Sequence, residues 1–365
     1  MPSDSSQNGQ EAVIFVGTYT TPEQSTSEGV YVYKMEPSTG NLTLKSVVKD
    51  LINPSYLAIH PQTGNVFVVH EKGTFEGQPG GGVIALGVDP QTGEVNILNK
   101  QSSGGEDPCY ISLERTGKYA LAANYISGSV SMLPIAADGR LLPVCSTIQH
   151  TGKSIHPERQ DKPYAHSILP DPTNVFAIAC DLGIDKLLIY RMDLENGQLI
   201  RHGEMSVKPG SGPRHLTFHP NGRYAYLACE LNSTVLAFTW DPDGGTLEEF
   251  QSVRTLPPGY EGRNLPADIH ISPDGAYLYV SNRGHDSFAC YEVSPESGTL
   301  TLKHHTATGG EEPRGFAIDP TGKYLISANQ NSNNIVTFLI DPGMGHLSKV
   351  GDEVQVSMPV CVKFA

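Results

Sequence analysis

The sequence has few charged residues, few cysteines and no long apolar run, and each scarcity excludes a class of protein. Only 18% of the 365 residues are charged and 38% are apolar, which suits a chain that folds around a substantial core. No run approaches the roughly 18 apolar residues of a membrane-spanning helix, so we expect no membrane association. The acidic excess, 39 Asp and Glu against 25 Lys and Arg, repels phosphate backbones, so nucleic acid is not an expected partner.

The cysteines are scattered and form no Cys-x-x-Cys pair, which argues against a zinc ribbon or a disulfide framework. We therefore expect reduced thiols and a cytoplasmic protein. Residues 1–10 are polar and lack the apolar segment of a secretory signal, so we expect a flexible N-terminal tail. Residues 11–365 are expected to form a single domain. The six cysteines are Cys109, Cys145, Cys180, Cys229, Cys290 and Cys361.

What the chain has in excess is turn-forming residues, with 38 glycines and 27 prolines. A recurring segment consists of a proline, a short apolar run, a turn, and a second β-rich run that ends in polar residues. Units of about 40 to 55 residues with four short strands each are typical of β-propeller blades. The prolines that begin the copies are Pro54, Pro108, Pro163, Pro213, Pro266, Pro313 and Pro359.

One copy of the repeat is divided between the two ends of the chain. Residues 359–365 leave room for a first strand only, whereas residues 12–18, 29–34 and 42–48 fit the second, third and fourth strands. We therefore expect the C-terminal strand to pair with the three N-terminal strands and to close the ring without an open sheet edge. The sequence predicts an all-β fold, a seven-bladed β-propeller with four antiparallel strands per blade.

In such a ring, the start of each first strand and the end of each second strand face the same mouth of the central channel. The second strands end, about 17 residues after the anchor prolines, at Glu71, Tyr125, Asp181, Glu230, Arg283 and Gln330. Alignment of the divided copy by its second strand adds Tyr19. The first strands contribute His166, Arg214, His215, Asp268, His270 and Arg314. Cations and carboxylates that converge in a concavity predict a binding or catalytic site.

Several of these residues also have a structural interpretation. Asp268 and His270 can serve simply to tie strands together, and Tyr19 and Tyr125 can pack at the rim. The charged run at residues 156–162 is either a solvated loop or a lid that supplies Arg159 or Gln160 to a substrate.

Five segments resemble the propeller-type 6-phosphogluconolactonase family: residues 212–220, 224–232, 267–275, 313–316 and 322–325. This family includes bacterial lactonases and a fungal carboxymuconate-lactonizing enzyme on the same seven-bladed scaffold. The resemblance implies a catalytic set of one histidine, two arginines and one glutamate. Matched motif by motif, these are His166, Arg214, Arg283 and Glu230.

The resemblance implies hydrolysis of 6-phospho-D-glucono-1,5-lactone, an anionic sugar lactone, to 6-phosphogluconate. We assign Glu230 as the general base that activates water, with His166 as the alternative base or proton donor. Arg214 and Arg283 would stabilise the developing oxyanion and the phosphate. No cofactor and no metal ion are expected. The predicted substrate-binding residues are His215, Arg314, Asp268, His270, Gln330 and Arg159.

Three other functions remain open at this point. A lactonizing cycloisomerase would use the same arginines to hold the carboxylates of a muconate. A non-catalytic propeller that binds a protein partner would show an apolar or tyrosine-rich rim. A metal-dependent lactonase would use Glu71, Asp181 and Glu230 as oxygen ligands. The sequence is compatible with a monomer but does not fix the oligomeric state.

Overall fold

The computed structural model describes residues 12–365, and the expected tail at residues 1–10 lies outside the described residues. The described part of the chain contains thirty strands and no helix. None of its elements is a helix long and apolar enough to cross a membrane.

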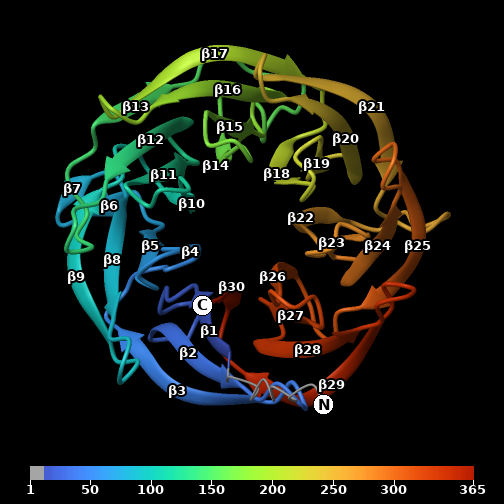
Figure 1. Cartoon of the computed structure of the whole chain (residues 1–365), viewed down its shortest axis with the longest axis horizontal. Coiled ribbons are helices and arrows are strands. Elements are labelled where there is room, and N and C mark those ends of the chain that lie inside the picture. Colours follow the sequence, from blue (N-terminus) through green and yellow to red (C-terminus); the bar gives the residue numbers. More distant parts are fainter. Residues whose placement is uncertain (1–11) are drawn as a thin grey trace, which may run out of the picture.

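The strands form seven four-stranded antiparallel sheets, which we call blades one to seven, around a central channel (Figure 1). Blade one contains β30 (Pro359–Phe364), β1 (Ala12–Thr18), β2 (Gly29–Met35) and β3 (Leu42–Lys49). Blade two contains β4 (Leu57–Ile59), β5 (Val66–His70), β8 (Gly82–Val88) and β9 (Val95–Ser102), with a small hairpin of β6 (Thr74–Phe75) and β7 (Gln78–Pro79) between β5 and β8. Blade three contains β10 (Pro108–Leu113), β11 (Tyr119–Asn124), β12 (Ser129–Pro134) and β13 (Ser146–Gln149).

The remaining four blades follow in chain order. Blade four contains β14 (Ala165–Pro170), β15 (Phe176–Asp181), β16 (Lys186–Asp193) and β17 (Gln198–Ser206). Blade five contains β18 (Pro213–Phe218), β19 (Tyr224–Cys229), β20 (Thr234–Asp241) and β21 (Thr246–Arg254). Blade six contains β22 (Leu265–Ile271), β23 (Tyr277–Arg283), β24 (Ser287–Val293) and β25 (Leu300–Ala307), and blade seven contains β26 (Pro313–Ile318), β27 (Tyr324–Asn329), β28 (Asn334–Ile340) and β29 (Leu347–Gln355).

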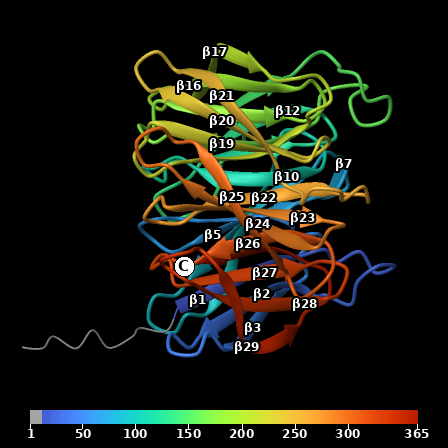
Figure 2. The same ribbon diagram turned by 90° about the vertical axis from the view of Figure 1, so that its right-hand side faces the viewer.

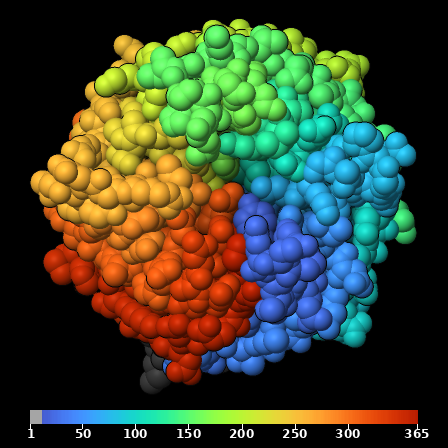
Figure 3. Space-filling model, turned by 180° about the vertical axis from the view of Figure 1, so that it is seen from behind, coloured from blue at the N-terminus to red at the C-terminus, as the bar shows by residue number. Residues whose placement is uncertain are grey.

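The ring is closed by pairing between the two ends of the described chain. Strand β30 runs antiparallel to β1, with Val362 opposite Val16 and Phe364 opposite Ile14. The N-terminal and C-terminal segments, blue and red, also lie against each other in the view from behind (Figure 3). The predicted seven-bladed propeller and its split blade are therefore confirmed.

The turns between first and second strands explain the recurring glycines. The residue that ends each of these turns has a positive φ, which L-residues other than Asn and Asp rarely adopt. Glycine supplies this conformation in five blades, and Asn174 supplies it in blade four with a φ of 63°. The five glycines are Gly64, Gly117, Gly222, Gly275 and Gly322.

The apolar core lies between the faces of neighbouring blades. In the side view, strands of different blades are stacked above one another (Figure 2). Between blades four and five, for example, Ile178 and Leu187 pack in one cluster with Leu227 and Phe238. The second and third strands are buried on both faces, whereas the outer fourth strands alternate between exposed and half-buried residues. This packing fixes the inner strands rigidly and so determines where their polar ends lie.

Candidate active site

A β-bulge near the start of the inner strand directs one side chain per blade toward the channel. In five blades the ladder between first and second strand skips a single residue. A bulge leaves the skipped residue unpaired and re-aims its side chain, which is why bulges recur beside active sites. All five skipped residues line one of two adjoining cavities: Cys109, His166, Arg214, Arg314 and Val360.

The larger cavity has a volume of about 260 Å³ and lies at the mouth of the channel. Four of its residues stand at the ends of second strands, as the register predicts. The others come from bulges, from one loop, which supplies Arg159, and from the first residue of β22, which is Leu265. A narrower cavity adjoins it and shares Glu71, Cys109, His166 and Arg314. The residues that line the larger cavity are Glu71, Cys109, Tyr125, Arg159, His166, Glu230, Leu265, Arg283 and Arg314.

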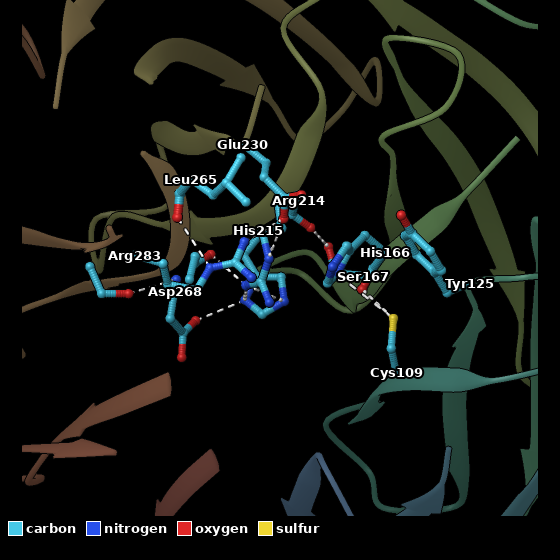
Figure 4. A network of polar contacts seen from close by, with 12 residues as sticks. Cys109, Tyr125, His166, Ser167, Arg214, His215, Glu230, Leu265, Asp268 and Arg283 are labelled. Atoms are coloured by element: carbon cyan, nitrogen blue, oxygen red, sulfur yellow. Dashed lines mark hydrogen bonds and ion pairs between the residues drawn. The ribbon is translucent and has the colours of Figure 1, made fainter. Parts of the chain in front are cut away.

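Glu230 accepts hydrogen bonds from three arginines and is 3% exposed. Two of these arginines, Arg214 and Arg283, are labelled together with Glu230 in Figure 4. Its Oε2 atom receives Arg283 Nη2 at 2.7 Å and Arg214 Nε at 3.1 Å, and its Oε1 atom receives Arg159 Nη2 at 2.5 Å. Burial alone would raise the pKa of this carboxyl, but the charges of Arg283, Arg214, His166 and Arg159 hold the pKa well below its usual value. Glu230 is therefore a carboxylate whose oxygens are already engaged.

The arginines are fixed by further contacts. Arg214 Nη1 donates to the carbonyl of Ala267 at 2.6 Å, and Arg283 Nε donates to the carbonyl of Leu265 at 3.1 Å. Arg159 also donates to the hydroxyl of Tyr125 at 3.2 Å. A set of guanidinium groups held in this way is preorganised to bind an anion.

His166 lies on the cavity wall between Tyr125, whose ring centroid is 5.3 Å away, and His215, also at 5.3 Å. Its Nδ1 atom is 3.7 Å from the sulfur of Cys109, and that thiol donates to the carbonyl of His166 at 3.3 Å. Burial, together with the charge of Arg214, lowers the pKa of His166 well below the usual value. The imidazole is therefore neutral near pH 7 and carries a free lone pair for a proton.

His215 lines the narrower cavity, and Asp268 is hydrogen-bonded to it from behind. His215 Nδ1 donates to Asp268 Oδ1 at 2.8 Å, and His270 Nε2 lies 3.1 Å from Asp268 Oδ2. Burial lowers the pKa of His215 to about 3, so this histidine is a neutral donor. Burial opposes ionisation of Asp268, but His270 and the hydrogen bonds from both histidines hold the pKa of its carboxyl well below its usual value. Asp268 and His270 line neither cavity, so they support the site from behind.

Glu71 occupies the opposite wall of the cavity. Its carboxylate accepts hydrogen bonds from the hydroxyl of Tyr19, at 3.1 and 3.2 Å, and from the hydroxyl of Ser55. The guanidinium of Arg314 stacks over the ring of Tyr19, 5.3 Å from its centroid. Burial raises the pKa of Glu71, although the charge of Arg314 counteracts the shift.

Some residues singled out in the sequence lie away from the cavity. Gln330 follows β27 at the expected position, but its amide donates to the side chain of Asn331 and it lines neither cavity. Asp181 binds His150 Nδ1 at 2.6 Å and the backbone N–H groups of Tyr164 and Gly183. Within residues 12–365, no group of three or more His, Cys, Asp and Glu side chains is arranged to hold a metal ion.

The segment at residues 156–162 supplies one residue to the site and anchors itself with another. Arg159 reaches the cavity, whereas Gln160 is fully buried and donates to the carbonyl of Leu182 at 2.9 Å. The sequence reasoning left Glu71, Cys109 and Tyr125 out of the predicted site, although all three line the cavity. Glu71 and Tyr125 stand at the strand-end position that identified Glu230, and Cys109 stands at the bulge position that identified Arg214.

Comparison with known proteins gives a consistent picture. The family model "Lactonase, 7-bladed beta-propeller" matches residues 13–364. The chain is 38% identical over 350 residues to the 6-phosphogluconolactonase of Bacillus subtilis. This match covers 96% of this chain and 97% of that protein. A 6-phosphogluconolactonase of Formosa agariphila is 34% identical, over 94% of this chain and 97% of that protein. The structure of a periplasmic gluconolactonase from Pseudomonas aeruginosa superposes with a TM-score of 0.89 at 34% identity, covering 98% of this chain and 99% of the other.

Proposed function

Because the chain belongs to the family of seven-bladed β-propeller lactonases, we propose that it hydrolyses 6-phospho-D-glucono-1,5-lactone to 6-phosphogluconate. The observation that carries the proposal is the composition of the cavity. Arg159, Arg283 and Arg314 line it, with Glu71 and Glu230 as the only carboxylates among its lining residues in the described chain. Such a cationic concavity attracts an anionic substrate although the whole chain carries a net charge of −14.

The lactone carbonyl needs donors for the oxyanion that develops when water attacks its carbon. Arg283 and Arg214 are the proposed donors, because Glu230 and two backbone carbonyls hold their guanidinium groups in fixed directions. Arg314 is the proposed partner of the substrate phosphate, since no carboxylate within residues 12–365 forms an ion pair with it.

The contacts favour His166 over Glu230 as the base. Glu230 has a strongly depressed pKa and accepts hydrogen bonds from three arginines, so it is a poor proton acceptor. His166 is neutral and lines the same cavity. In this mechanism the imidazole takes a proton from the attacking water and returns it to the ring oxygen when the C–O bond of the lactone breaks. The products are a free hydroxyl group and a carboxylic acid, which ionises to the carboxylate and releases the second proton of the water to solvent.

Substrate binding would improve His166 as a base. In the free protein, the pKa of His166 is depressed partly by the positive charge of neighbouring arginines. A bound phosphate offsets that charge and therefore raises the pKa of His166 toward neutrality. The base is then better matched to the proton transfer in the complex than in the empty site.

A lactonizing cycloisomerase remains the second candidate, because its carboxylated substrate would also bind to Arg214 and Arg283. The presence of Glu71 in the cavity disfavours it, since a carboxylate repels a carboxylated substrate. We retain the cytoplasm as the proposed compartment because all six cysteines are free, although one relative is a periplasmic enzyme.

Acid release from fresh 6-phosphogluconolactone tests the proposal, with spontaneous hydrolysis subtracted and 6-phosphogluconate identified as product. We expect a rate well above the buffer control that is unchanged in EDTA. The same preparation should not convert 3-carboxymuconate. A rate equal to the buffer control would refute the proposed hydrolysis, and loss of activity in EDTA would refute the metal-free mechanism.

A further inference from the structure

Glu71 is a half-buried carboxylate with a role that the hydrolytic mechanism leaves unassigned. It follows β5 in blade two and lines both adjoining cavities, on the wall opposite Glu230. Its two side-chain donors are hydroxyls, Tyr19 from blade one and Ser55 from its own blade. It forms no ion pair with any residue of the described part of the chain.

A comparison with Asp181 separates a structural carboxylate from one that faces a ligand. Asp181 stands at the matching strand end in blade four, and its oxygens accept two backbone N–H groups and one histidine N–H. It is fully buried and touches neither cavity. Glu71 has only two hydroxyl partners and borders open volume, although a carboxylate has about four acceptor positions. Glu71 therefore keeps acceptor capacity toward the cavity.

Partial removal of such a carboxylate from water without a direct ion pair costs free energy, and the raised pKa of Glu71 reflects this desolvation. A protein that needed only to join blades one and two could do so with a neutral side chain. A carboxylate in a cavity lined by arginines has two effects on ligands: it accepts hydrogen bonds from hydroxyl groups, and it repels other carboxylates.

We propose that Glu71 is the specificity-determining residue that selects polyhydroxylated anions over polycarboxylates, by accepting hydrogen bonds from the hydroxyls of the sugar. The proposal rests on the proposed function and extends it, since it names the hydroxyl groups of the substrate as the feature that the cavity wall opposite Glu230 recognises. In this proposal Arg314 binds the anionic end of the ligand, and Glu71 accepts hydrogen bonds from its hydroxyl groups. Tyr19 and Ser55 position the carboxylate for this task.

Ligand binding tests this selection independently of catalysis. Titration calorimetry would compare 6-phosphogluconate, which carries hydroxyls, with tricarballylate, a polyanion of similar charge that has none. We expect the wild type to bind 6-phosphogluconate at least about tenfold more tightly, because a ligand without hydroxyls leaves the polar groups of such a site unpaired. Glu71→Gln should narrow this preference at least tenfold, by weaker binding of 6-phosphogluconate and tighter binding of tricarballylate.

Two further variants keep the test decisive. Glu76→Gln removes an exposed carboxylate of the same blade and should leave the preference unchanged. Ser55→Ala keeps the charge of Glu71 but removes one of its hydrogen-bond donors, so it should narrow the preference by a smaller factor than Glu71→Gln does. If Glu71→Gln does not fold, Ser55→Ala still tests the proposal. An unchanged preference in Glu71→Gln or in Ser55→Ala would overturn the proposal. The outcome is distinct from that of the acid-release assay, because a protein without lactonase activity would still show the selection.

Discussion

Arg283 donates from its Nη2 atom to Oε2 of Glu230 at 2.7 Å, although the two residues are 53 positions apart and end strands of neighbouring blades. The same oxygen also receives Arg214, and the second oxygen receives Arg159. Glu230 is thus the common partner that keeps three cations together in a buried site. Its removal should therefore affect stability as well as activity.

We predict that Glu230→Gln lowers the free energy of unfolding by about 3 to 5 kcal/mol, because the buried guanidinium groups of Arg214 and Arg283 and the half-buried one of Arg159 lose their counter-charge. Sulfate should restore more thermal stability to this variant than to the wild type by binding among the arginines. Thermal unfolding with and without sulfate measures both effects.

Glu292→Gln provides the matched control. Glu292 pairs with Lys303 on the surface, where the two side chains are 52% and 41% exposed, so its loss should change stability by less than about 1 kcal/mol. Equal melting temperatures for Glu230→Gln and Glu292→Gln would contradict the role of Glu230 as counter-charge.

The pH dependence of kcat/KM should report a histidine with a lowered pKa. Burial and Arg214 favour the neutral form of His166, so its acid limb should lie below pH 6.5. Arg314→Gln removes one nearby positive charge and should move the limb to higher pH. Glucono-1,5-lactone is the substrate for this profile, because a phosphate group itself titrates near pH 6. A limb at or above pH 6.5 in the wild type would argue against His166 as the base.

Stability should decline on mild acidification. In the unfolded chain His166 and His215 bind protons near pH 6.5, whereas burial keeps them neutral in the folded protein. Between pH 6.5 and 5 the unfolded state therefore binds more protons, and each such histidine lowers the free energy of unfolding by up to about 1.4 kcal/mol per pH unit. Denaturant unfolding at several pH values measures the slope. A free energy that stays constant or rises toward pH 5 would contradict this protonation state.

Removal of residues 359–365 should disrupt the ring. The truncation deletes β30, exposes the edge of β1, and loses the buried side chains of Val360, Cys361 and Val362. We expect aggregation and a much lower melting temperature, seen by light scattering and thermal unfolding. Deletion of residues 1–10, the expected tail, is the control and should leave the melting temperature unchanged. A truncated protein that melts like the wild type would show that ring closure contributes little.

The ring could be predicted because its determinants are local and repeated. Anchor prolines, positive-φ turn residues and alternating strands recur along the repeats, so a strand or turn that is hard to recognise in one copy can be located by comparison with the other copies. Strand ends share a register, and this places Glu230 and Arg283 at one mouth. The bulges beside the anchor prolines also follow the repeat, which is why Arg214 and His166 point into the channel.

Contacts that occur only once could not be predicted in this way. Arg159 reaches Glu230 from a loop whose course depends on the burial of Gln160, and no repeat constrains it. Asp268 turns away from the cavity because two histidines hold it. Gln330 has the right register, but its side chain pairs with Asn331 instead. Register alone fixes the height of a residue along the strand and leaves the direction of its side chain to its neighbours.

The central claim is that arginines from separate blades act together on a lactone carbonyl. The most direct test is the initial rate of acid release from 6-phosphogluconolactone by the wild type, by Arg283→Ala, and by Arg223→Ala, which removes an exposed arginine of blade five outside the cavity. The account predicts that Arg283→Ala loses about 100- to 1,000-fold in kcat, the usual effect of removing one oxyanion donor, while Arg223→Ala keeps the wild-type rate. A wild-type rate no faster than spontaneous hydrolysis, or an Arg283→Ala variant as active as Arg223→Ala, would contradict it.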